Sequence, residues 1–109
     1  MKLILAIVHN DDVPRLTERL TEGGFGATRV ASTGGFLRQG NTTFLIGVED
    51  HQVDEVIALI RETCRRRTQY VHPLPPAGFG EEMAYAQPME VEVGGALIFV
   101  LPVERVERI

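Results

Sequence analysis

Several residue types are scarce in this 109-residue chain, and each scarcity excludes a class of protein. The single cysteine, Cys64, cannot form a disulfide within the chain, so a disulfide-stabilised secreted domain is excluded and the reducing cytosol is expected. The longest unbroken apolar runs, Leu3 to Val8 and Ala96 to Leu101, are too short for a membrane span or a signal peptide. At this length we expect one domain, residues 1–109.

Lysine and arginine are missing from one long segment of the chain, residues 68–103. The protein has 15 acidic and 11 basic residues and a net charge of −4, which disfavours nucleic acids and membrane surfaces as partners. Between Thr68 and Val103 there is no Lys or Arg, although four glutamates lie there. An anionic ligand is therefore expected to bind elsewhere on the protein.

Apolar periodicity predicts the order strand, helix, strand, strand, helix, strand. The expected strands are 2–8, 25–33, 42–48 and a final pair, 89–93 and 96–103, joined by a tight turn at Gly94-Gly95; the helices are 11–23 and a segment from an Asp50 N-cap to Cys64. This order is that of an α+β, ferredoxin-like βαββαβ sandwich with both helices on one face. We expect the first and third strands to lie parallel at its centre, and residues 68–88, with four prolines, to form a long flexible loop.

The first strand is apolar on both of its faces, which predicts a central position in the sheet. Two helices on one face cannot cover the other face, so we expect a second copy of the chain to bury it and the protein to be an oligomer. Cys64 continues the apolar stripe of the second helix and is therefore expected in the core.

Features of an enzyme are weak in this sequence. The three histidines, His9, His51 and His72, have no metal-type spacing to one another or to Cys64, so no metal site is expected. The glycine-rich stretch GGFLRQGN contains neither a nucleophile elbow nor a P-loop. We expect a protein without catalytic activity.

The segment from Gly34 to Asn41 is the strongest candidate for a binding site. Its glycines let backbone N–H groups turn toward an anion, Arg38 adds positive charge, and Phe36 is large enough to stack on a flat base. The alternative is that Phe36 and Leu37 pack on a neighbouring subunit and the glycines only form the turn. The run 65–67, three arginines, offers a second anion contact or, as the favoured alternative, complements the helix C-terminus in solvent.

Longer stretches of the sequence resemble one known family. KLILAIV, TGGFLRQGNTTFLIGVED, RETCRRRTQ and PMEVEVGGALIFVLPV are similar to the PII-like cyclic-di-AMP receptor proteins of bacteria, and the resemblance extends over nearly the whole chain. It implies a non-catalytic, cytoplasmic signal transducer without a cofactor. It also implies a homotrimer shaped like the nitrogen-regulatory PII proteins, with cyclic-di-AMP bound between subunits.

The resemblance assigns a set of ligand contacts. It places Phe36 and Leu37 against an adenine, brings the ligand close to the backbone at two glycines, and supplies polar contacts and a pocket wall from the strands. The full set is Thr28, Gly35, Phe36, Leu37, Asn41, Gly47 and Phe99.

Two positions depart from the family pattern. One is Gly24, where some relatives carry Asn, and the other is near the start of the second strand. Relatives begin the second strand with Phe-Arg-x-Thr, and the Arg contributes to the ligand site, whereas this chain has Gly26 there. Arg29 cannot replace it, because strand alternation puts Arg29 on the face opposite Gly26 and Thr28. We therefore expect weaker cyclic-di-AMP binding or a shifted nucleotide preference. The alternative function is a trimeric protein-interaction module that contacts an unidentified partner through residues 68–88.

Overall fold

The computed structural model describes residues 1–31, 40–71 and 89–109, and its elements follow the predicted order with one addition, a strand after the second helix. Two short 3-10 turns, η1 (Asn10–Asp12) and η2 (Asp50–Gln52), lead into the helices. The helices are α1 (Val13–Glu22) and α2 (Val53–Thr63). The strands are β1 (Lys2–His9), β2 (Ala27–Ala31), β3 (Asn41–Val48), β4 (Arg67–Val71), β5 (Met89–Val93) and β6 (Ala96–Pro102).

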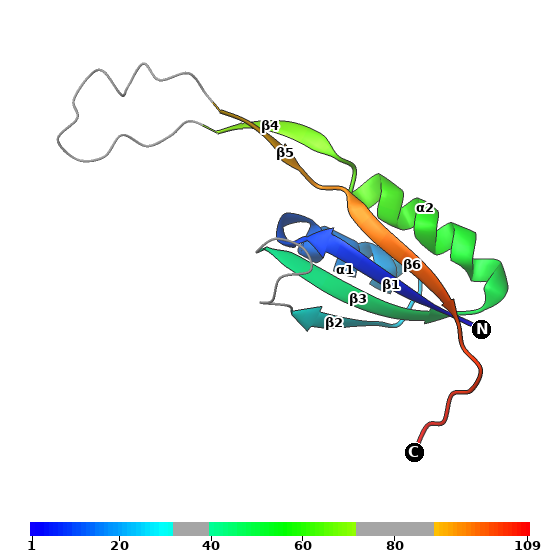
Figure 1. The fold of residues 1–109 in the computed structure, drawn as a ribbon. Helices are drawn as coiled ribbons and strands as arrows, with labels where there is room; N and C mark the ends of the chain where they lie inside the picture. Colours follow the sequence, from blue (N-terminus) through cyan, green and yellow to red (C-terminus); the bar gives the residue numbers. More distant parts are fainter. Residues whose placement is uncertain (32–39, 72–88) are drawn as a thin grey trace, which may run out of the picture.

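Four strands form the main sheet in the order β2-β3-β1-β6, and β1 and β3 are central as expected. Both helices pack on the same face of this sheet, which gives a two-layer α+β sandwich (Figure 1). The predicted ferredoxin-like fold is confirmed. No helix among the described residues combines the length and apolar character needed to cross a membrane.

The relative direction of the central strands corrects one expectation. β1 and β3 are antiparallel rather than parallel, with Lys2 opposite Val48 and His9 opposite Asn41. β2 is also antiparallel to β3, so β1 and β2 run in the same direction. The crossover through α1 starts β2 in the direction of β1, and β3 then lies between the two and runs back along both.

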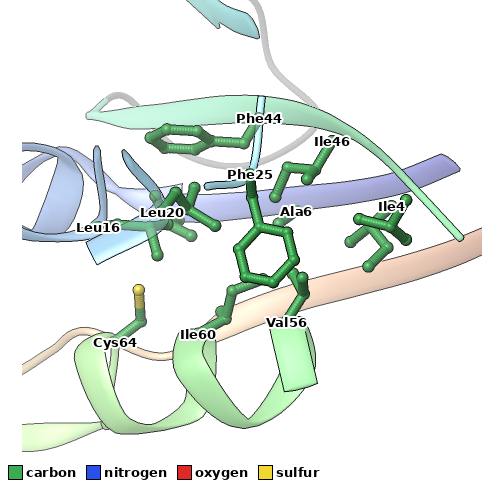
Figure 2. Close-up of a cluster of buried hydrophobic side chains, with 12 residues drawn as sticks. Ile4, Ala6, Leu16, Leu20, Phe25, Phe44, Ile46, Val56, Ile60 and Cys64 are labelled. Atoms are coloured by element: carbon green, nitrogen blue, oxygen red, sulfur yellow. The ribbon is translucent and has the colours of Figure 1, made fainter. Parts of the chain in front are cut away.

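The core lies between the helices and the even-numbered side chains of the central strands. Ile4, Phe44 and Ile46 from the sheet are completely buried and face the helices (Figure 2). Cys64, at the end of α2, belongs to this cluster, as predicted from the helical stripe. The remaining members are Ala6, Val8, Leu16, Leu20, Phe25, Val48, Val56 and Ile60.

The start of α2 also differs from the prediction. Glu49, not Asp50, precedes the first turn, and its backbone N–H donates to Gln52 Oε1 at 2.9 Å. This is one half of a capping box, in which the third residue of the turn satisfies the backbone of the cap. Asp50 instead pairs with the N-terminal ammonium of Met1 at 3.0 Å, and this contact lowers the pKa of Asp50.

The strands β4 and β5 form a separate two-stranded ribbon that extends away from the sandwich (Figure 1). Two expectations were wrong here. The segment after α2 begins with a strand rather than a loop at Thr68, and β5 pairs with β4 rather than forming a hairpin with β6. The rest of the expected loop, residues 72–88, lies outside the described residues.

Two glycines connect the ribbon to the sandwich. Gly94 and Gly95 both have φ of 84°, and a Cβ on Gly94 would collide with the carbonyl oxygen of Arg65. Gly95 N–H donates to the Cys64 carbonyl at 2.5 Å, which holds the connection against the end of α2. Positive φ at two successive residues suits a tight hairpin turn, but here it serves to move the chain from one sheet to another.

Candidate functional site

The main sheet has one face that the helices leave open. In β1 the odd-numbered residues Leu3, Leu5 and Ile7 point to this face and are half-buried. They lie opposite Leu101, Phe99 and Leu97 of β6, which are 40 to 43% exposed. An exposed apolar surface this continuous marks an interaction site in a protein of this size. We call this surface the open face.

Four residues of the predicted ligand set lie at positions on the open face. Thr28 is opposite Leu45, Leu45 is opposite Leu5, and Leu5 is opposite Phe99, so Thr28 and Phe99 end one row across all four strands. Gly47 is in the next row, opposite Leu3. Asn41 begins β3 and shares the face because it alternates with the buried Phe44 and Ile46.

The other three residues of the predicted set, Gly35, Phe36 and Leu37, lie outside the described residues and stay predictions. The chain re-enters the described part of the molecule at Gly40. There the carbonyl of Gly40 accepts the backbone N–H of Asn10 at 2.6 Å, and Thr42 Oγ1 donates to Asn10 Oδ1 at 2.6 Å. These bonds fix the C-terminal end of the glycine-rich segment beside the end of β1.

The space around Gly26, where the sequence departs from the family pattern, is open. A Cβ built on Gly26 would have no atom within 4 Å among the described residues, so a side chain can start there without a clash. Arg29 lies opposite Phe44, which faces the helices. The structure therefore confirms that Arg29 lies on the face opposite Thr28, as strand alternation predicts.

A hollow of about 330 Å³ lies where the open face meets the base of the ribbon. Asn41 and His9 line it from the main sheet, Arg66 from the end of α2, and Gly94 and Gly95 from the connection to β6. Asn41 is thus brought beside a positive charge. From the sequence we favoured the interpretation that the arginines of residues 65–67 are solvated at the helix C-terminus. The shared hollow of Arg66 and Asn41 depends on tertiary structure, which no local sequence pattern contains.

The neighbouring Arg67 has a different role. Its Nη2 donates to Asp12 Oδ1 at 3.0 Å, and Arg15 Nη2 donates to the same oxygen at 2.8 Å. Asp12 is completely buried, and its Oδ2 has no hydrogen-bond partner among the described residues. This carboxylate therefore connects α1 to the first residue of β4 and anchors the ribbon.

A second hollow, of about 520 Å³, lies between the end of α2 and β6. Ile57, Ile60 and Ile98 form its apolar part, and Arg61 and Arg65 are at its edge. No residue of the predicted ligand set lines it. Although it is larger, it is less relevant to the predicted site than the hollow beside Asn41.

The side chains with catalytic potential are dispersed. Across residues 1–31, 40–71 and 89–109, no three His, Cys, Asp or Glu side chains are close enough to hold a metal ion. His9 Nδ1 accepts the N–H of Asp11 at 3.4 Å, His51 is exposed, and His72 is outside the described residues. Burial raises the pKa of the Cys64 thiol to about 11, with the carboxylate of Asp12 as a second cause, so this cysteine is a poor nucleophile at neutral pH.

Fold and site together define a small ferredoxin-like sandwich whose open sheet face is apolar and carries polar groups toward its ends, a surface suited to binding. The family model of the cyclic-di-AMP receptors matches residues 1–109, and the chain belongs to this family. The resemblance found in the sequence is thereby confirmed.

A solved structure supports the same fold. It is the crystal structure of a functionally unknown protein from Pediococcus pentosaceus ATCC 25745, which is 38% identical to this chain. The alignment covers 99% of this chain and 96% of that protein, with a TM-score of 0.78.

Proposed function

We propose that this protein is a cytosolic, non-catalytic signal transducer that binds cyclic-di-AMP between the subunits of a homotrimer and passes the signal to a protein partner. The observation that carries the proposal is the common location of Thr28, Asn41, Gly47 and Phe99 on the open face. These residues are far apart in sequence, and an arbitrary set of strand residues would be divided between the two faces.

The apolar character of the open face supports binding between subunits. Phe99 and its neighbours in β6 are more than a third exposed in the single chain, so burial against a second copy would remove a large apolar area from water. A ligand that lies between copies would meet Phe99 from one side and polar groups such as Thr28 and Asn41 from another. Adenine rings suit such a surface because they are flat and apolar, with polar edges.

Titration calorimetry with cyclic-di-AMP, combined with a measurement of molecular mass in solution, tests this proposal. We expect saturable binding of one ligand per chain by a particle of three chains. A trimer that gives no binding heat up to high micromolar ligand would contradict the receptor function. A saturable complex with a monomer would contradict binding between subunits.

A trimeric protein-interaction module with a weakened nucleotide pocket is the second candidate, and Gly26 is the observation that favours it. A missing charge-assisted hydrogen bond to a phosphate is worth about 1.5–3 kcal/mol, which is roughly a ten- to hundred-fold change in affinity. A Cβ at position 26 would meet no atom within 4 Å, so the backbone there accepts a side chain in place of Gly26.

The variant Gly26→Arg separates the two candidates, and Ala27→Arg is its matched control. Ala27 lies opposite Ile46, so an arginine there adds the same charge one residue away but on the other face of the sheet. If the natural protein binds cyclic-di-AMP and Gly26→Arg tightens the binding, the receptor function stands. Tight binding that appears only in Gly26→Arg, and not in Ala27→Arg, would instead support the interaction module.

A further inference from the structure

The hollow at the base of the ribbon contains a positive charge without a strong partner in the described part of the chain. Arg66 is exposed, and the acidic group nearest to it in this region is Glu92 of β5, with 4.0 Å between Arg66 Nε and Glu92 Oε2. Both side chains are at least 70% exposed. An ion pair at this distance and exposure contributes little to stability, so Arg66 is able to exchange its partner at low cost.

The backbone around Arg66 keeps the hollow open on one side. Arg66 Nε lies 3.9 Å from the position that a Cβ of Gly95 would occupy, so the guanidinium passes over a residue without a side chain. Gly94 next to it has no room for a side chain at all. Gly95 therefore leaves space beside the guanidinium that a ligand oxygen could fill.

The two neighbouring arginines do not share this setting. Arg67 is committed to the buried carboxylate of Asp12 at 3.0 Å, and Arg65 lines only the larger hollow beside α2. Arg66 alone of the three lines the hollow that also contains Asn41 and His9. These surroundings combine one strong cation with neutral hydrogen-bonding groups, a combination that suits a phosphate oxygen.

We propose that Arg66 binds a phosphate of the nucleotide in this hollow and releases Glu92 when it does so. The proposal rests on the proposed receptor function and adds a contact that links the ligand to the ribbon. Glu92 competes with the phosphate for the same guanidinium, and a charge-assisted hydrogen bond to a phosphate is stronger than an exposed ion pair at 4.0 Å. Ligand binding would thus remove a contact between β5 and the segment that follows α2, while Arg67 and Asp12 keep the ribbon attached.

The test is a calorimetric titration of cyclic-di-AMP into the full chain, three single variants and one double variant. We expect Arg66→Gln to raise the Kd about ten-fold, because one charge-assisted hydrogen bond is lost. Arg65→Gln is the matched control, which removes the same charge one residue away, and its Kd should stay within about two-fold of the natural protein. Glu92→Gln should lower the Kd a few-fold, and this gain should vanish when Arg66→Gln is also present.

A second ligand, adenosine, separates a contact with the phosphate from an indirect effect of Arg66→Gln on the rest of the site. Adenosine has no phosphate, so its affinity, where measurable, should be the same in the natural protein and in Arg66→Gln. Equal weakening of cyclic-di-AMP binding by Arg65→Gln and Arg66→Gln, or a Glu92→Gln effect that persists without Arg66, would overturn the proposal. All three side chains are exposed, so we expect every variant to fold. Thermal unfolding of each variant checks this.

Failure of the receptor function gives a different result from failure of this proposal. If the natural protein does not bind cyclic-di-AMP, the backbone amide resonances of Gly94 and Gly95 are followed during a titration with pyrophosphate. A saturable shift that Arg66→Gln abolishes and Arg65→Gln retains would keep Arg66 as a phosphate ligand even though the proposed receptor function is wrong. The absence of any such shift would overturn the site as well.

Discussion

The two faces of the central strand β1 are both apolar, yet they lie in different environments. In β1, Ile4, Ala6 and Val8 are completely or almost completely buried beneath the helices, whereas the alternating residues toward the open face are only half-buried. The contrast is weaker in β6, where Ile98 packs on the core but Val100, on the same side of the strand, is 40% exposed, close to the 43% of Phe99. One face therefore stabilises the folded chain, and the other is available for binding.

Two phenylalanines on opposite faces provide the strongest test of this comparison. Phe44 is completely buried and Phe99 is exposed, so Phe44→Ala should cost about 3–5 kcal/mol of unfolding free energy at every protein concentration. Phe99→Ala should cost less than about 1 kcal/mol in dilute protein, with a larger effect only at concentrations where chains associate. Urea denaturation at two concentrations measures both, and equal losses for the two variants would refute the division of roles.

The buried carboxylate of Asp12 should give the next largest effect. Asp12→Asn removes the negative charge that holds Arg15 and Arg67, and we expect a loss of about 1–3 kcal/mol in unfolding free energy. Hydrogen exchange of the β4 amides should also become faster, because Arg67 anchors that strand. The exposed neighbour Asp11 is the control, and Asp11→Asn should change stability by less than about 0.5 kcal/mol. Equal effects of the two substitutions would contradict the anchoring role.

Alkaline pH probes the helix-covered face through Cys64. The pKa of this thiol is raised from 9.0 to about 11, first by burial, so the folded protein holds a proton that the unfolded chain releases above pH 9. The stability that this proton contributes is complete below pH 9 and is lost as pH rises toward 11. Unfolding free energy should therefore fall more steeply over this range in the natural protein than in Cys64→Val. Parallel pH profiles for the two proteins would show that the thiol is not buried in this way.

The sequence was informative where the physical cause is local. Two-sided apolar alternation placed β1 at the centre of the sheet, and the stripe on α2 placed Cys64 in the core; both expectations are confirmed. The same alternation correctly separated Arg29 from Thr28. Each of these conclusions follows from the 2- or 3.6-residue period of a single element.

The errors arose where two elements compete for the same neighbour. Gly94-Gly95 has the composition of a hairpin turn, but β6 pairs with β1 and β5 pairs with β4. The distinct roles of Arg66 and Arg67 likewise depend on Asp12 and Asn41, which are more than 20 residues away in the sequence. No local pattern encodes which distant partner a side chain will meet.

The most direct test of the central claim, that the open face is the ligand surface, is a crystal structure of the protein with cyclic-di-AMP. The account predicts ligand density against the open face, in contact with Phe99 and within hydrogen-bond distance of Thr28 or Asn41, with residues of a second copy on its other side. Density in the hollow between α2 and β6, or a ligand that contacts the helix layer and leaves Phe99 exposed, would contradict it.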